Sequence, residues 1–203
     1  EIKGMNFENI VGHEEIIKII KDIIIKNKEG HAYVFSGPSG IGKKTIAKVF
    51  SKALLCTNKT KGNPCGSCVS CKSFESYSNS DFFIADTSLS SIGVDVIRDI
   101  LKSTKVKPYY SEKKVYLIPN ADKMTVQAQN CILKTLEDPP GHTVIILTAI
   151  NYEYFLETIK SRIVRYNMKA NTQSEVYQYI ETFTKEHDSS NMGSIASFAE
   201  GSI

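Results

Sequence analysis

One stretch, Gly37–Thr45 (GPSGIGKKT), constrains the fold more than any other part of this chain. It lies between an apolar run, Tyr33-Val34-Phe35, and a helix-compatible run that begins at Thr45. This order gives a strand, then a glycine-rich turn, then a helix N-terminus. Such a turn directs free backbone N–H groups and a lysine at a bound anion. The stretch therefore predicts a phosphate-binding loop, or P-loop, between a strand and a helix.

The loop departs from its consensus at one position. The pattern G-x-x-x-x-G-K-[ST] has a hydroxyl directly after the lysine, where it ligates magnesium, and Lys44 stands there instead. We therefore do not expect magnesium to bind well, and the sequence leaves open whether ATP or ADP binds. The residues that we expect to hold a nucleotide's phosphates are Gly37, Gly40, Gly42, Lys43, Lys44 and Thr45.

A second departure follows the apolar run Val115–Ile118, which predicts a buried strand. An active P-loop ATPase carries an acidic pair after this strand, one carboxylate for magnesium and a glutamate that orients the attacking water. Here Pro119 and Asn120 occupy those positions. Together with Lys44 they remove three groups from one reaction centre, so we expect no hydrolysis by this chain.

Four cysteines form the pattern C-x8-C-x2-C-x2-C, with Gly62, Asn63, Pro64 and Gly66 providing turns between them. Four thiolates in a tetrahedral arrangement make a closed structural zinc site, which leaves no position for a substrate. The alternative is a set of free thiols. We expect zinc to be bound by Cys56, Cys65, Cys68 and Cys71.

The remaining pattern alternates short apolar runs with amphipathic ones, which predicts right-handed βαβ units and a parallel sheet. The run at 143–147 is rich in β-branched residues and is expected to be a central strand. After Tyr166 the pattern becomes helical, at 171–184 and again from Ile195, so we expect a domain boundary near 167. Other strands are expected at 31–36 and 81–86, and helices at 13–28, 45–56, 94–105, 125–137 and 152–160.

Length and composition limit the class of protein that this chain can be. A chain of 203 residues with 41% hydrophobic residues can bury a sizeable core, and its formal charge of +3 only weakly suggests an anionic partner. The sequence contains neither an 18-residue apolar run nor the pattern of a signal peptide, which favours a soluble cytoplasmic protein. Because the last residues, Gly201–Ile203, fall within what looks like an element, we expect a piece of a longer protein.

Four segments together resemble the AAA+ clamp-loader subunits of bacterial DNA polymerase III, and within that family the delta-prime type. They are His31–Pro38 (HAYVFSGP), the four-cysteine insert, Ala128–Pro140 (AQNCILKTLEDPP) and Ser161-Arg162. These segments extend over nearly the whole chain. The cysteine insert beside AQNCILKTLEDPP is the specific part of the resemblance.

The resemblance implies an AAA+ nucleotide-binding-type α/β domain at 1–166 with the zinc module 56–71 inserted, and the first part of a helical lid at 167–203. We expect the family's C-terminal oligomerisation domain to lie outside this fragment. The implied role is a non-hydrolysing subunit that supports the loading of a sliding clamp onto DNA. The implied partners are the gamma/tau and delta subunits and, through the complex, the clamp and primer–template DNA; no membrane is implied.

The resemblance also gives Arg162 a role, as an arginine finger that projects into the ATP site of a neighbouring subunit. Guanidinium suits this role because it is always charged and forks onto phosphate oxygens. Ile163 stands where the family has a cysteine, a change that leaves the arginine in place. The plainer alternative for Arg162 is a surface salt bridge.

The sequence leaves two other classes of function open. One is an active gamma/tau-like ATPase, in which Thr45 ligates magnesium and another acid replaces the missing pair. The other is a zinc-containing nucleic-acid-binding module with a vestigial P-loop. Separately, Lys102, Lys105 and Lys107 form either a solvated basic face or a contact with nucleic-acid phosphates.

Overall fold

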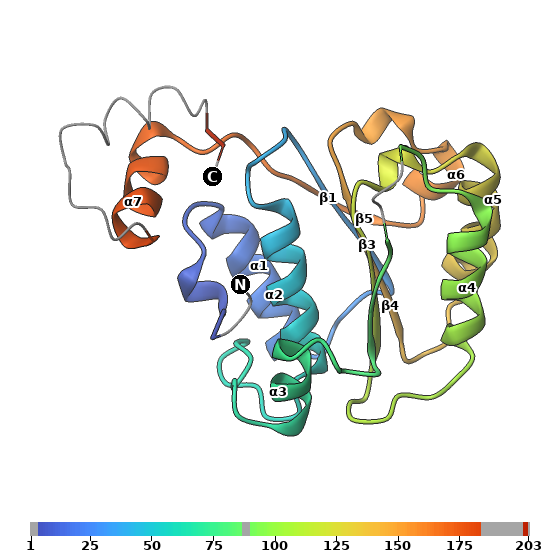
Figure 1. The fold of residues 1–203 in the computed structure, drawn as a ribbon, viewed down its shortest axis with the longest axis horizontal. Coiled ribbons are helices and arrows are strands. Elements are labelled where there is room, and N and C mark those ends of the chain that lie inside the picture. Colours follow the sequence, from blue (N-terminus) through green and yellow to red (C-terminus); the bar gives the residue numbers. More distant parts are fainter. Residues whose placement is uncertain (1–3, 87–89, 184–200, 203) are drawn as a thin grey trace.

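The computed structural model of this chain describes residues 4–86, 90–183 and 201–202 (Figure 1). Its centre is a five-stranded sheet in the order β2-β3-β4-β1-β5, and every neighbouring pair is parallel. The strands are β1 (Ala32–Ser36), β2 (Phe82–Ile84), β3 (Lys114–Ile118), β4 (Thr143–Ala149) and β5 (Val164–Asn167). The predicted parallel α/β sheet is confirmed, with β4 at its centre.

Helices cover both faces of the sheet (Figure 1). Along β1, Tyr33 and Phe35 join one buried cluster, whereas Ala32 and Val34 join the other, as the twofold period of a strand requires. One face carries α1 (Glu14–Ile25), α2 (Lys43–Leu55) and α3 (Val69–Glu75); the other carries α4 (Val94–Thr104), α5 (Val126–Glu137) and α6 (Glu157–Lys160). The sheet is therefore buried on both faces, which explains its continuous apolar runs.

The segment at 152–160 is not the single helix that its sequence predicts. A 3-10 turn (Tyr152–Tyr154) and α6 are separated by Phe155, which is extended, and Leu156, which is not helical either. Phe155 is only 2% exposed and packs into the cluster beneath α4 and α5. Tertiary packing of this one aromatic ring therefore overrides the local helical pattern.

Several smaller expectations also change. The stretch after Arg162 forms the edge strand β5, and α3 begins within the cysteine insert and continues beyond it to Glu75; neither element was predicted. Cys131 lies in the predicted helix 125–137, where a small apolar residue is expected to be buried, but it is only partly buried against the core. The segment 88–91, whose sequence SLSS predicts a loop, lies partly outside the described residues, and the helix predicted from Ile195 lies wholly outside them.

The predicted change to a helical pattern after Tyr166 is followed by α7 (Gln173–Phe183), and the division into two domains near 167 stays a prediction. Within the described residues, none of the helices is long and apolar enough to cross a membrane.

Candidate functional site

The P-loop lies at the carboxyl end of β1, where ligands of parallel sheets bind. Gly37 donates its N–H to the carbonyl of Ala149 at the end of β4, and a Cβ at this position would lie 2.2 Å from the Met168 carbonyl oxygen. Gly42 has a φ of 85° and directly precedes α2. Only glycine adopts both arrangements without strain, so these glycines fix how the chain turns from strand into helix.

The loop borders a cleft of about 250 Å³ at the start of α2. The first backbone N–H groups of α2 have no partner within the helix and face this end, which suits a bound anion. Five of the six residues predicted to hold phosphates line this cleft, together with residues from the ends of β3 and β4, whereas Gly37 does not line it. The lining residues are Ser39, Gly40, Gly42, Lys43, Lys44, Thr45, Pro119, Asn120, Thr148 and Ile150.

The side chain of Lys43 folds back onto the loop itself. Its Nζ donates to the carbonyl of Gly37 at 2.7 Å and to that of Pro38, and the residue is 8% exposed. Burial lowers the pKa of Lys43, while the negative charge of Asp122 opposes that shift. Lys43 therefore closes the loop, and it would have to exchange its carbonyl partners for phosphate oxygens when a nucleotide binds.

Across the cleft, the end of β3 offers neither of the carboxylates that hydrolysis needs. Asn120 has a φ of 49°, a left-handed conformation that asparagine tolerates, and donates its N–H to the Thr148 hydroxyl at 3.1 Å. Asp122, the nearest acid in sequence, accepts the backbone N–H groups of Ile150 and Asn151 through Oδ2. Asp122 therefore braces the turn after β4 and does not line the cleft.

A second cleft, of about 300 Å³, adjoins the P-loop. His13 lines it and contacts the carbonyl of Ile41 through Nε2 at 2.9 Å. Asn171 also lines it and is 7% exposed; its amide nitrogen donates to Gly201, and its Oδ1 has no hydrogen-bond partner among the described residues. Sequence reasoning missed both residues, because no local motif marks them.

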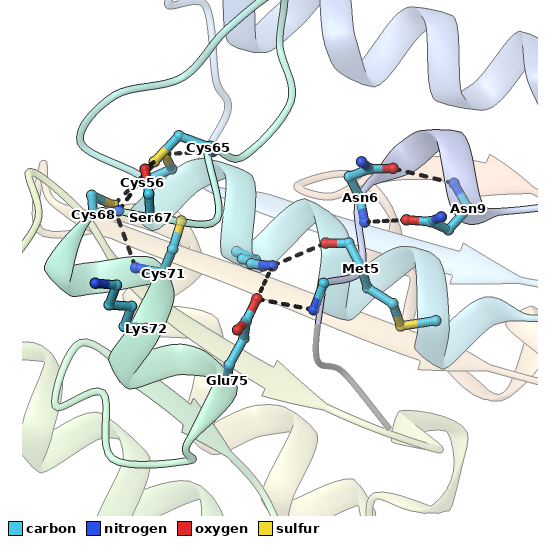
Figure 2. Close-up of polar contacts among 12 residues, drawn as sticks. Met5, Asn6, Asn9, Cys56, Cys65, Ser67, Cys68, Cys71, Lys72 and Glu75 are labelled. Atoms are coloured by element: carbon cyan, nitrogen blue, oxygen red, sulfur yellow. Dashed lines mark hydrogen bonds and ion pairs between the residues drawn. The ribbon is translucent and has the colours of Figure 1, made fainter.

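The four predicted metal ligands come together in one cluster (Figure 2). The ligand atoms of Cys56, Cys65, Cys68 and Cys71 all lie within 4.8 Å of one another, and the Cys56 and Cys68 sulfurs are 3.9 Å apart. Tetrahedral zinc with Zn–S bonds of about 2.3 Å places its sulfurs about 3.8 Å apart. The cluster therefore fits one zinc ion, with all four positions taken by protein.

Backbone donors support the charge of these thiolates. The N–H groups of Cys65, Cys68 and Cys71 donate in turn to the sulfurs of Cys56, Cys65 and Cys68 at 3.2–3.4 Å. A hydrogen bond from the Cys71 thiol lowers the pKa of Cys56 to about 6, and the same contact raises the pKa of Cys71. Metal binding would release the remaining thiol protons, so its affinity should fall as the pH is lowered.

A buried ion pair joins the cysteine module to the rest of the domain. Lys52 of α2 is 1% exposed and donates to Glu75 of α3 at 2.7 Å and to the Met5 carbonyl at 3.0 Å. Glu75 also accepts the N–H of Gly4, and Figure 2 shows its side chain reaching towards the segment around Met5. One pair therefore ties α2, the cysteine module and the N-terminal segment together.

We expect Lys52→Met to destabilise the protein by about 3 kcal/mol, because it leaves a largely buried carboxylate beside an apolar side chain. Urea unfolding of the two proteins measures the difference. Lys72→Met, at an exposed position of α3, is the matched control and should change stability by less than about 0.5 kcal/mol. An equal loss in both variants would contradict the assignment of this effect to the ion pair.

Arg162 does not line the P-loop cleft of its own chain. It follows α6, whose Ile159 packs into the cluster on the sheet face opposite α2. Its guanidinium forms an ion pair with Glu137 at 2.9 Å, and its side chain remains 35% exposed. The surface salt bridge considered as the alternative therefore exists in this chain, and it leaves part of the guanidinium accessible.

The fold and these sites together point to one family. The family model described as DNA polymerase III, delta subunit, matches residues 12–172, well over half of the chain. The chain belongs to this clamp-loader family. The match extends from the start of the α1 region through the P-loop, the cysteine module and β5.

Curated relatives of this clamp-loader chain are tau and gamma subunits. DNA polymerase III subunit tau of Bacillus subtilis is 35% identical over 99% of this chain and 36% of the relative. Subunit tau/gamma of Haemophilus influenzae is 32% identical over 97% of this chain and 29% of the relative. The chain thus spans about a third of the length of these relatives.

Solved structures agree on the fold of the clamp-loader chain. A gamma-subunit-related protein of Thermotoga maritima aligns with a TM-score of 0.56 and 24% identity, over 81% of this chain and 49% of that one. The RuvB Holliday junction branch migration motor of the same organism aligns with a TM-score of 0.64 and 14% identity, over 99% of this chain and 61% of that one. The predicted AAA+ P-loop type of fold is therefore confirmed.

Proposed function

We propose that this chain is a clamp-loader subunit of the delta-prime type, which does not hydrolyse ATP and supports the loading of a sliding clamp onto DNA. The observation that carries the proposal is the composition of the cleft beside Lys43. Among the described residues, this cleft is lined by Pro119 and Asn120 and by no carboxylate. Without a carboxylate, magnesium has no anchor at the end of β3 and the attacking water has no base.

The same cleft still suits a nucleotide. The P-loop supplies N–H groups and Lys43 for the phosphates, and the neighbouring cleft beside His13 and Asn171 would take the base. The Oδ1 of Asn171 is buried against Gly12 and has no partner among the described residues, so it would accept from a base amino group once that packing opened. In this proposal ATP or ADP is held as a structural ligand, and magnesium is not required.

Two further parts complete the proposal. Cys56, Cys65, Cys68 and Cys71 hold a structural zinc ion, and Arg162 reaches the ATP of a neighbouring subunit. The partners are gamma/tau and delta subunits and, through the assembly, the sliding clamp and primer–template DNA. Arg162 lies away from the P-loop cleft of its own chain, so its position favours a role at the ATP site of a neighbouring subunit.

The second candidate is an active gamma/tau-like ATPase. The 35% identity to a tau subunit over almost the whole chain favours it. It requires Thr45 to ligate magnesium and an acid from outside the P-loop cleft to replace Pro119 and Asn120.

ATP turnover by the purified protein separates the two candidates. We expect no turnover above that of a Lys43→Ala control purified in parallel, because three groups of the reaction centre are missing. Calorimetric titration with ATP, with and without magnesium, should show binding that magnesium does not strengthen. Turnover at about 1 s⁻¹ or faster that disappears in the Lys43→Ala control would contradict the delta-prime proposal and support the gamma/tau candidate.

A further inference from the structure

Glu137 is the last residue of α5, and this is an unfavourable place for its charge. The C-terminal end of a helix carries partial negative charge and favours cations. Glu137 is 52% exposed and is followed by Asp138 and the rigid pair Pro139-Pro140, which end the helix. Helix stability therefore gives no reason for a carboxylate at this position.

The contact that Glu137 makes does give a reason. Its Oε1 lies 2.9 Å from Nη2 of Arg162, while Nη1 donates to the Thr158 carbonyl at 2.8 Å and to the Ser161 hydroxyl at 3.0 Å. The guanidinium is planar, so acceptors on both Nη atoms fix its plane as well as its position. Glu137 is the acceptor that comes from another helix, since Thr158 and Ser161 are close neighbours of Arg162 in sequence.

The guanidinium of Arg162 remains accessible from one side while Glu137, Thr158 and Ser161 accept its hydrogen bonds. A broad open concavity of about 690 Å³ lies beside it, lined by His31, Leu136, Glu137 and the segment 161–164. Among the described residues, Arg162 Nε has no hydrogen-bond acceptor, whereas both Nη atoms have one. A phosphate oxygen that enters from this side would therefore meet an oriented guanidinium with donors to spare.

We propose that Glu137 is a positioning residue for Arg162, holding the guanidinium in the orientation in which it meets the phosphates of a neighbouring subunit's nucleotide. This inference rests on the proposed arginine finger. A long arginine side chain loses much rotamer freedom when it docks, and a pre-formed ion pair removes part of that loss before the subunits meet. Glu137 and Arg162 are both partly exposed, so water screens the negative charge that Glu137 places beside the guanidinium. The orientation that Glu137 gives the guanidinium depends less on this screening.

The experiment is steady-state ATP turnover of the complete clamp-loader assembly containing this subunit, in the presence of primer–template DNA. We expect Glu137→Ala to lower kcat about tenfold with KM for ATP unchanged, because orientation matters in the transition state. Glu137→Gln keeps an acceptor in place and should stay within about threefold of wild type. Glu157→Ala is the control: it removes a carboxylate on α6 that pairs with Lys160 and is more exposed than Glu137, 87% against 52%, and it should not change kcat.

A double mutant makes the test specific to Arg162. Adding Glu137→Ala to Arg162→Ala should cause no further loss, since the residue then has nothing to position. A further loss in that background, or a rise in kcat for Glu137→Ala alone, would overturn the inference. If Glu137→Ala kept wild-type kcat while Arg162→Ala was defective, the positioning role of Glu137 would be overturned and the arginine finger would stand. If both variants kept wild-type kcat, the arginine finger itself would be overturned.

A second measurement does not depend on assembly. Relaxation of the Arg162 side-chain ¹⁵Nε in the full-length subunit should report an ordered guanidinium in wild type and a mobile one in Glu137→Ala. Equal order in the two proteins would overturn the inference even if the variant failed to assemble.

Discussion

Replacing Arg162 with alanine should lower ATP hydrolysis at the neighbouring subunit's site by about 10³-fold while leaving the fold of this subunit unchanged. The large effect follows from the chemistry of phosphoryl transfer, in which charge spreads over the equatorial oxygens and is stabilised by fixed cations. The small effect on folding follows from the exposure of the side chain, since a surface ion pair contributes about 0–1 kcal/mol. DNA-stimulated turnover of the assembly and thermal unfolding of the subunit measure the two parts.

Arg162→Lys is the informative companion to this variant. Lysine keeps the charge but cannot fork onto two oxygens, so we expect it to recover only a small part of the lost rate. Lys160→Ala, two residues away and paired with Glu153 and Glu157, controls for a local change in charge and should keep wild-type turnover. Full activity in Arg162→Lys would show that charge alone is sufficient, and unchanged activity in Arg162→Ala would rule out the finger.

Removal of zinc should lower the melting temperature by at least about 10 °C and disorder the cysteine module first. The free energy of a structural zinc site is about 10–16 kcal/mol in small domains, and much of it stabilises the folded module. Here the consequence extends further, because α3 carries Cys71 and also Glu75, which anchors the N-terminal segment through Lys52 and Gly4. Calorimetry with and without a chelator measures the loss.

The fifth cysteine provides a matched control for the zinc prediction. Cys65→Ser removes one ligand that is only partly buried, so the change costs little packing, and it should abolish the bound zinc and the associated stability. Cys131→Ser alters a partly buried cysteine of α5 outside the cluster and should retain one zinc per chain. If Cys65→Ser retained its zinc and its melting temperature, the four-cysteine assignment would be wrong.

The sequence was sufficient to predict those features that have a local or periodic signal. The apolar runs of β1, β3 and β4 predicted a parallel sheet because strands buried on both faces must be continuously apolar. The spacing of the cysteines predicted their cluster, because short turns leave few ways to arrange four thiols that lie so close in sequence. The glycines of the P-loop predicted its place at the end of β1.

The features that were missed depend on contacts between distant segments. The segment that forms β5, Val164–Asn167, contains only two apolar residues beside Arg165 and Asn167, and it is a strand because it pairs with β1, more than 100 residues earlier. The contact between Glu137 and Arg162 joins the ends of two helices that are separated by β4 and its turn. Asn171 lines the second cleft only because the chain returns to the P-loop after β5.

One comparison tests the central claim, that this subunit contributes Arg162 and not its own P-loop to hydrolysis. The measurement is DNA-stimulated ATP turnover of the complete assembly carrying either Lys43→Ala or Arg162→Ala in this subunit. We predict turnover within about threefold of wild type for Lys43→Ala, because its cleft lacks catalytic carboxylates, and a large loss for Arg162→Ala. A large loss in Lys43→Ala together with wild-type turnover in Arg162→Ala would contradict the claim.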